Sequence, residues 1–199
     1  YTNTSMIGGQ TKTPTISVLF NNKIDYVGGA GIVAKHLKQA GADVTFTSVV
    51  GDDALAKFAS NDLQFSGIKL NFIKDKTRPT INKNVIIAEN YRMLKVDTLD
   101  NSAIQTSIIE EINKKIKNNT NEILIFSDFR HGIFNKHSIP IFEEFIPKNI
   151  FKVADSQVAS RWGNITEFQN FDLITPNEKE ARFALADQDS TVGVLSETI

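Results

Sequence analysis

The sequence predicts an α/β protein whose body is a doubly wound, mostly parallel sheet flanked by helices, with a small β-lid added to it. Short, continuous apolar runs alternate with amphipathic segments after residue 40, an order typical of a parallel sheet covered by helices. Two alternating runs, 81–89 and 91–97, are separated only by Asn90, which predicts a β-hairpin. The hairpin breaks the alternation of strands and helices, so we assign it to the lid.

The first forty residues are expected to form a loop, a strand and a helix. Residues 1–13 are polar and contain glycine, which favours a loop. Residues 14–20 are rich in β-branched side chains, which favours a strand. A helical pattern runs from Gly28 to Ala40, and Gly41 then provides a C-terminal cap.

Beyond Gly41 the predicted strands and helices follow one another. Strands are expected at 43–50, 68–74, 123–126, 150–154 and 171–175. Helices are expected at 54–63, with Asp52 or Asp53 as its cap, and at 101–118, 137–145 and 178–186. The helix at 101–118 has the clearest pattern, one apolar stripe with Lys and Glu opposite, formed by Ile104, Ile108, Ile109, Ile112 and Ile116.

The composition excludes several classes of partner. Lys and Arg number 22 and Asp and Glu 23, which gives a net charge of −1, whereas proteins that bind nucleic acid are usually strongly basic. No apolar run approaches the roughly 20 residues that a membrane-spanning helix needs. The 199 residues include no cysteine, which removes disulfides and thiolate chemistry and fits a reducing, cytoplasmic location. We therefore expect neither nucleic acid nor a membrane as partner.

Three polar side chains, Asp128, Asp155 and Asn177, stand where predicted strands end. In open α/β sheets ligands bind beyond the carboxyl ends of the strands, so this edge is the expected binding site. Asp128 lies beside Arg130 and His131, where a carboxylate could contact sugar hydroxyls, a phosphate or Mg²⁺ through water. The alternative is an ion pair within the loop.

Asn177 and Glu180 open the last predicted helix three residues apart, and hence on one face. Glu180 could hold hydrated Mg²⁺, which prefers oxygen ligands and keeps several waters. The alternative is a capping box, in which Asn177 caps the helix and Glu180 reaches back to it. The spacing alone favours the capping box.

The segment Gly28-Gly29-Ala30-Gly31 precedes a helix and would let a ligand approach the backbone closely. The alternative is a simple tight turn. Gly29-x-Gly31-x-x-Ala34 fits only the looser form of the dinucleotide fingerprint, and seven residues separate it from the strand that ends at Phe20. A Rossmann dehydrogenase is therefore a weak alternative.

Taken together, these motifs resemble those of the ribokinase-like (PfkB) carbohydrate kinases, and most closely the heptose-phosphate kinase branch. The matching segments cover nearly the whole chain in the family's order. They are the Gly-Gly turn and helix from Gly28 to Ala42, the Val-Gly-x-Asp element at 49–53, the lid segment Tyr91 to Asp97, the strand end Ser127 to Gly132, and the Asn-x-x-Glu element at 175–180.

The resemblance implies a ribokinase-like fold that phosphorylates a sugar or sugar phosphate with ATP and Mg²⁺. The implied lid covers about 14–27 and 68–97, and the α/β core about 28–67 and 98–199. Substrate contacts carried over to this sequence are Gly28, Gly29, Ala30, Asp128 and Arg92. Contacts to the nucleotide are Asn177, Glu180 and Asp155, with Glu180 also at the metal.

The sequence departs from the family pattern at several points. Ile32 stands where members often have an Asn that contacts the sugar, and the branch's usual Lys is replaced within Phe129-Arg130-His131. By resemblance, a first strand with a sugar-binding Asp is expected before Tyr1. The Gly-Ala-Gly-Asp motif with the catalytic base is expected beyond Ile199. Residues 1–199 are thus expected to form a partial domain that contains no catalytic base and is inactive by itself.

A second class of function remains open, a non-catalytic sugar-binding or dimerisation module of a larger, nucleotidyltransferase-linked protein. The substitution at Ile32 favours it slightly. The lid is expected to pair two copies of the chain, and the alternative is that it folds onto its own substrate cleft. The apolar face expected to form the pair consists of Ile16, Val18, Val85 and Ile87.

Overall fold

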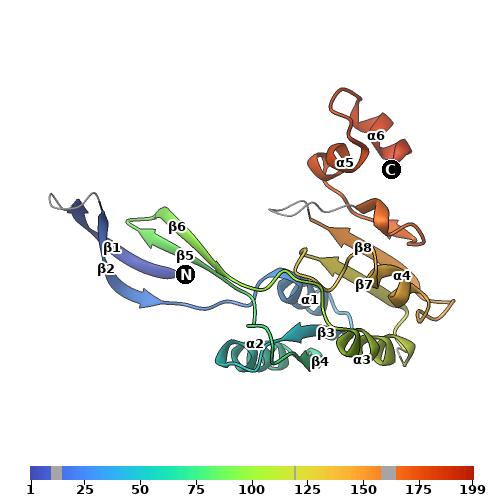
Figure 1. Cartoon of the computed structure of the whole chain (residues 1–199), viewed down its shortest axis with the longest axis horizontal. Coiled ribbons are helices and arrows are strands. Elements are labelled where there is room, and N and C mark those ends of the chain that lie inside the picture. The colour runs from blue at the N-terminus through green and yellow to red at the C-terminus, as the bar shows by residue number, and fades with distance from the viewer. Residues whose placement is uncertain (10–14, 119, 158–164) are drawn as a thin grey trace.

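The computed structural model describes residues 1–9, 15–118, 120–157 and 165–199, which form an α/β body and an extended lid (Figure 1). The lid strands are β1 (Thr2–Gly9), β2 (Ile16–Lys23), β5 (Asn82–Ala88) and β6 (Tyr91–Thr98). The body strands are β3 (Thr45–Val50), β4 (Lys69–Lys74), β7 (Ile123–Asp128), β8 (Phe151–Ser156) and β9 (Leu173–Ile174). The helices are α1 (Gly29–Gln39), α2 (Ala54–Phe65), α3 (Thr106–Lys117), α4 (Ser138–Glu143), α5 (Glu178–Leu185) and α6 (Val192–Thr198), with a 3₁₀ turn η1 at Ile165–Glu167.

The body confirms the predicted fold class. Strands β3 and β4 pair in parallel, and so do β7, β8 and β9 in that order. Helix α3 packs against β4 and carries four isoleucines of the predicted stripe, while Ile104 precedes the helix; all five are buried. It packs in one cluster with Ile73, Phe126 and Phe142, and each such side chain contributes roughly 1.5–3 kcal/mol on burial. None of the described helices is long and apolar enough to cross a membrane.

Strand β4 belongs to the body, although the sequence assigned 68–97 to the lid. Its Ile73 is 1% exposed and enters the larger core, while Leu70 and Phe72 pack against the smaller core around Leu63. A strand that is buried on both faces is typical of a parallel sheet. The lid therefore draws only on β5 and β6 from that range.

The lid contains a strand that the sequence prediction missed. Residues 2–9, predicted as loop, form β1, which lies between β2 and β5 and separates the two strands that were expected to be neighbours. Thr2 and Thr4 fix it through their hydroxyls, which donate to Asn84 Oδ1 at 3.0 Å and to the Ile87 carbonyl at 2.9 Å. The strand was missed because its polar residues give no apolar alternation.

The register also corrects the expected apolar lid face. Thr4 pairs with both Phe20 and Ala88, so these three side chains lie on one face of the lid sheet. Val18 lies two residues from Phe20 and shares that face. Val85 and Ile87 lie an odd number of residues from Ala88 and therefore face the other way. The apolar lid face consists instead of Met6, Ile16, Val18, Phe20, Ile86, Leu94 and Val96. The opposite, charged lid face carries Leu19, Lys83, Val85, Lys95 and Asp97.

Most other predicted elements are present with shifted ends. The helix predicted at 101–118 begins at Thr106, because residues 101–104 bind neighbouring loops instead. Strand 171–175 is reduced to Leu173–Ile174. Helix α6 was not predicted, and Thr191 caps it by accepting from the Val194 N–H. Pro14, the first residue of the predicted strand 14–20, lies outside the described residues.

Candidate functional site

The glycine turn at the start of α1 lies beside the loop that follows β7. Gly29 has a φ of +53°, a left-handed conformation that favours glycine. A Cβ at Gly29 would lie 3.9 Å from the ring of Phe129. A Cβ at Gly28, the N-cap, would meet nothing within 4 Å, and no side chain caps the helix. The backbone from Gly28 to Ala30 is thus open to a ligand, and a sugar contact there stays a prediction.

Asp128 lies at the end of β7 with its carboxylate turned inward. The residue is 1% exposed and accepts hydrogen bonds from the backbone N–H of Arg130 at 2.7 Å, from Arg130 Nη1 at 2.9 Å and from Ser156 Oγ at 2.9 Å. Arg130 itself has a φ of +59°. The ion pair that was the alternative interpretation is therefore present, and Asp128 shapes the loop. A direct substrate contact would require Arg130 to move.

His131 and Asn101 form a contact that was not predicted from the sequence. His131 Nδ1 lies 2.8 Å from Asn101 Oδ1, so the loop after β7 is bound to the segment that leads out of the lid. The Ile104 N–H donates to the Gly132 carbonyl at 3.2 Å in the same place. Only the fold brings these residues together, because about thirty residues separate them in the chain.

A buried charge pair holds the base of the lid. Arg78 Nε donates to Asp75 Oδ2 at 2.8 Å, and both side chains are less than one-tenth exposed. The guanidinium also donates to the carbonyls of Ser102 and Ala103, at 3.4 and 3.3 Å. A Cβ at Gly132 would clash with the Ser102 carbonyl oxygen. Arg78 thus joins the segment that enters the lid to the segment that leaves it.

The predicted nucleotide side shows a complete capping box. Asn177 Oδ1 accepts from the Glu180 N–H at 3.0 Å, and Glu180 Oε2 accepts from the Asn177 N–H at 2.9 Å. Glu180 is 8% exposed. The structural interpretation of this motif is therefore confirmed, and one carboxylate oxygen of Glu180 is not used by the cap.

Asp155 lies near this cap and accepts from Thr175 Oγ1 at 3.1 Å. Burial raises the pKa of Asp155, the hydrogen bond from Thr175 opposes this, and the negative charges of Glu180 and Asp128 raise the pKa further. A cation beside these carboxylates would lower the pKa of Asp155 again. Asp155 and the carboxylate oxygen of Glu180 that the cap does not use are oxygen ligands of the kind that Mg²⁺ prefers.

No group of three or more acidic or histidine side chains in the described part of the chain could hold a metal ion. Magnesium usually keeps several waters and is bound by one or two carboxylates together with phosphate oxygens, so it does not require such a group. The metal role of Glu180 stays a prediction.

Arg92 is not brought to the strand ends. It follows the tight turn formed by Glu89 and Asn90, whose φ values of 49° and 68° are those of a type I′ hairpin. This turn lies at the end of the lid that points away from the body (Figure 1). Lys83 and Lys95 lie farther from the turn along β5 and β6 and act electrostatically on His131.

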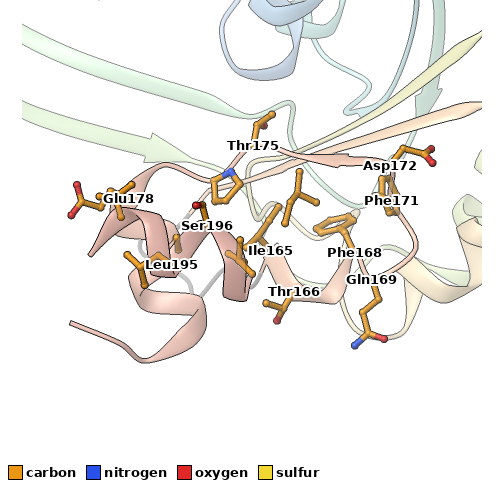
Figure 2. Close-up of a pocket in the computed structure, with 15 residues that line it drawn as sticks. Ile165, Thr166, Phe168, Gln169, Phe171, Asp172, Thr175, Glu178, Leu195 and Ser196 are labelled. Atoms are coloured by element: carbon orange, nitrogen blue, oxygen red, sulfur yellow. The ribbon is translucent and has the colours of Figure 1, made fainter. Parts of the chain in front are cut away.

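A cavity of about 740 Å³ lies elsewhere, between η1, β9, α5 and α6 (Figure 2). Ile165, Phe168 and Leu195 are among its apolar lining, and Thr175 and Glu178 lie at its polar side. None of the predicted substrate or nucleotide contacts lines it. The site predicted from the sequence and this cavity are therefore lined by different residues.

Comparison with known proteins places the chain in a family. The profile of the pfkB family carbohydrate kinases matches residues 21–198. The bifunctional protein HldE of Nitratiruptor sp. is 30% identical over 172 residues, which cover 80% of this chain and 33% of that protein. The bifunctional protein HldE of Campylobacter jejuni serotype O:6 is 33% identical over 162 residues, with the same two coverages. The chain thus spans about a third of the length of these curated relatives.

Solved structures share the fold. Phosphofructokinase-2 from Escherichia coli in complex with fructose-6-phosphate superposes with a TM-score of 0.72 at 16% identity, over 98% of this chain and 64% of that one. Ribokinase from Giardia lamblia superposes with a TM-score of 0.66 at 16% identity, over 98% of this chain and 65% of that one. Since the family profile matches most of the chain and the fold agrees, this chain belongs to the pfkB family of carbohydrate kinases.

Proposed function

We propose that the complete polypeptide transfers a phosphoryl group from ATP to a hydroxyl of a sugar or sugar phosphate, with Mg²⁺. One observation carries the proposal. The open turn from Gly28 to Ala30 lies against Phe129 at the end of β7, on the edge where a ligand of a parallel sheet binds. The fructose-6-phosphate bound in the structure of phosphofructokinase-2 supports a phosphorylated sugar as substrate. We propose a cytoplasmic location as well, because the 199 residues contain no cysteine.

The residues of this chain would act by binding and positioning. Backbone N–H groups at Gly28 and Gly29 would hold the sugar, and Asp128 would keep the adjacent loop in place through Arg130. Asn177 and Glu180 would orient the nucleotide's phosphates, with Asp155 beside them. Bound Mg·ATP would supply the phosphoryl group, and most of the rate would come from positioning and charge neutralisation.

The second candidate is a sugar-binding or dimerisation module without catalysis. Ile32, 38% exposed in the first turn of α1, favours it because an aliphatic side chain cannot hydrogen-bond a sugar hydroxyl. The two candidates differ in one respect that can be measured, which is sugar-dependent consumption of ATP.

We expect the complete polypeptide to consume ATP in the presence of a sugar phosphate, and the 199-residue chain to show no such activity. The reason is that the Gly-Ala-Gly-Asp motif, which by resemblance carries the proton-accepting Asp, does not occur between residues 1 and 199. A coupled assay for ADP measures both. Sugar-dependent turnover by the short chain would contradict the assignment of the base, and its absence from the complete polypeptide would favour the module.

The lid supports a further part of the proposal, a homodimer. Ile16, Phe20 and Leu94 of the apolar lid face are 63%, 62% and 56% exposed. The opposite lid face carries the charged side chains Lys83, Lys95 and Asp97 and is less suited to an apolar interface. A two-fold dimer would cover the same apolar patch twice.

We expect Leu94→Lys to convert the dimer into a monomer, because it places a charge on the apolar lid face, at its β6 edge. The matched control is Leu19→Lys, since Leu19 is 58% exposed but lies on the charged face. Light scattering at micromolar concentration measures the mass. A monomeric wild type, or equal behaviour of the two variants, would count against pairing through this face.

A further inference from the structure

His131 lies in the loop at the end of β7 and joins it to the base of the lid. It follows Phe129, whose ring lies beside Gly29, in the loop at the end of β7. It binds Asn101, in the segment that leads out of the lid. The charged lid face carries Lys83, Asp97 and Lys95, and their charges act on His131. The imidazole therefore joins the end of β7 to the base of the lid, two residues along the chain from the Phe129 ring that lies beside the turn at α1.

The bond to Asn101 determines which ring nitrogen carries the proton. The amide oxygen of Asn101 can only accept a hydrogen bond, so Nδ1 of His131, 2.8 Å away, must donate. In a neutral imidazole the other nitrogen, Nε2, then has a lone pair and no proton. Nε2 in this arrangement is an acceptor that needs a donor.

The ring stays neutral near pH 7. Burial lowers the pKa of His131 below its ordinary value, and Lys83 and Lys95 lower it further, against Asp128 and Asp97, which raise it. The tautomer set by Asn101 is thus the form that a ligand would meet.

The Nε2 atom is buried, and it has no hydrogen-bond partner among the described residues. A buried acceptor without a donor destabilises the fold, so such atoms normally have a partner in the working state of a protein. A donor that arrives with the substrate would recover this cost. Sugar hydroxyls are donors of this kind.

We propose that His131 Nε2 accepts a hydrogen bond from a hydroxyl group of the sugar and so helps to determine which sugar is bound. The inference rests on the proposed function and adds a residue that the sequence motifs do not assign. The neutral imidazole of His131 accepts a hydrogen bond and so recognises a hydroxyl group. A lysine ammonium group at the same position would instead bind a phosphate. Through Asn101, the same imidazole would connect the bound sugar to the base of the lid.

Three substitutions at His131 in the complete polypeptide distinguish a hydrogen-bond acceptor from an apolar side chain and from a cation. His131→Gln keeps an acceptor near the position of Nε2, His131→Leu removes it, and His131→Lys replaces it by a cationic donor. Titration calorimetry with a panel of hexose and heptose phosphates gives the affinities. We expect Leu and Lys to weaken binding about tenfold, the usual effect of one lost hydrogen bond, and Gln to stay close to wild type. His137→Leu, an exposed histidine at the start of α4, is the matched control and should leave the affinity unchanged.

The outcomes separate the inference from the proposed function. If the wild type binds none of the sugar phosphates, the proposed function is overturned and the sugar contact with it. If the wild type binds but the Leu variant binds equally well, only the contact is overturned, and Nε2 then bonds to water alone. Tighter binding by the Lys variant would show a phosphate site instead.

A second measurement does not depend on the sugar. Two-bond ¹H–¹⁵N correlation spectra of the histidine rings report the tautomer, and the His131 signals are those that disappear in the Gln variant. We expect the Nδ1–H tautomer, with Nε2 shifting on addition of the sugar phosphate. An Nε2–H tautomer in the free protein would overturn the proposal.

Discussion

Replacing Arg78 by Met is expected to lower the free energy of unfolding by about 3–5 kcal/mol. Arg78 and Asp75 are 8% and 4% exposed, so the substitution leaves a buried carboxylate without its cation. Two hydrogen bonds from Thr77, at 2.9 and 2.6 Å, remain and compensate only in part. Chemical denaturation measures the loss, and amide hydrogen exchange should show faster opening around Ser102, whose carbonyl loses its donor.

Lys69→Met provides the control for Arg78. Lys69 binds Asp43 at 2.8 Å, but both side chains are about two-thirds exposed, and exposed pairs contribute little. We expect no measurable change for this variant. Equal effects of the two substitutions would contradict the role of burial. The double variant Asp75→Asn/Arg78→Met should regain part of the stability, because it removes the charge that the single variant leaves unpaired.

The dependence of the Arg78 effect on pH has a definite sign. The hydrogen bond from the Thr77 hydroxyl is the largest cause that lowers the pKa of Asp75, burial opposes it, and Arg78 lowers the pKa as well. The unfolded-state pKa of Asp is about 3.9, and a carboxyl whose pKa is lower in the folded state stabilises the fold above that pH. This stability is lost as the pH falls through the folded-state pKa. The difference in the free energy of unfolding between wild type and Arg78→Met should therefore be largest near neutral pH and should become smaller in acid.

Glu180→Gln in the complete polypeptide is expected to lower turnover at least about hundredfold, if Glu180 organises Mg²⁺ and the phosphates. The substitution removes one charge but keeps the capping bond, because Gln also serves at the third position of a capping box. Stability should change by less than about 1 kcal/mol. The measurement is turnover as a function of Mg²⁺ concentration.

Thr191→Ala is the matched control for Glu180. It removes the cap of α6, in which Thr191 accepts from the Val194 N–H, and so it should lower stability slightly and leave turnover unchanged. A Gln variant with wild-type turnover and an unchanged requirement for Mg²⁺ would show that Glu180 acts only in the cap.

Sequence patterns predicted the body better than the lid, for a physical reason. The isoleucine stripe of α3 and the apolar run at β7 follow from burial on one side or both sides of an element, which periodicity detects. Strand β1 is stabilised by backbone bonds to two neighbours and by threonine hydroxyls, so its sequence has no such period. The apolar lid face could not be deduced, because it depends on where β1 enters the sheet.

The candidate site was predictable where it depends on short motifs. The turn at Gly28 and Gly29 and the capping box at Asn177 lie within a few residues of the chain, and both are present. The pairing of His131 with Asn101 depends on how the lid returns to the body, and no local spacing encodes it. Likewise, the inward orientation of the Asp128 carboxylate and its three hydrogen bonds from Arg130 and Ser156 depend on the folded structure.

The hairpin turn at the free end of the lid has a practical consequence. Tyr91, the first residue after it, is 70% exposed, and Phe65, at the end of α2, is 95% exposed. Because the 199 residues contain no cysteine, a thiol introduced at each of these two positions would be chemically unique within this chain. Two fluorescent dyes attached there would report by energy transfer how far the end of the lid lies from the body. A change of this distance on addition of a sugar phosphate could then be measured in solution, one molecule at a time.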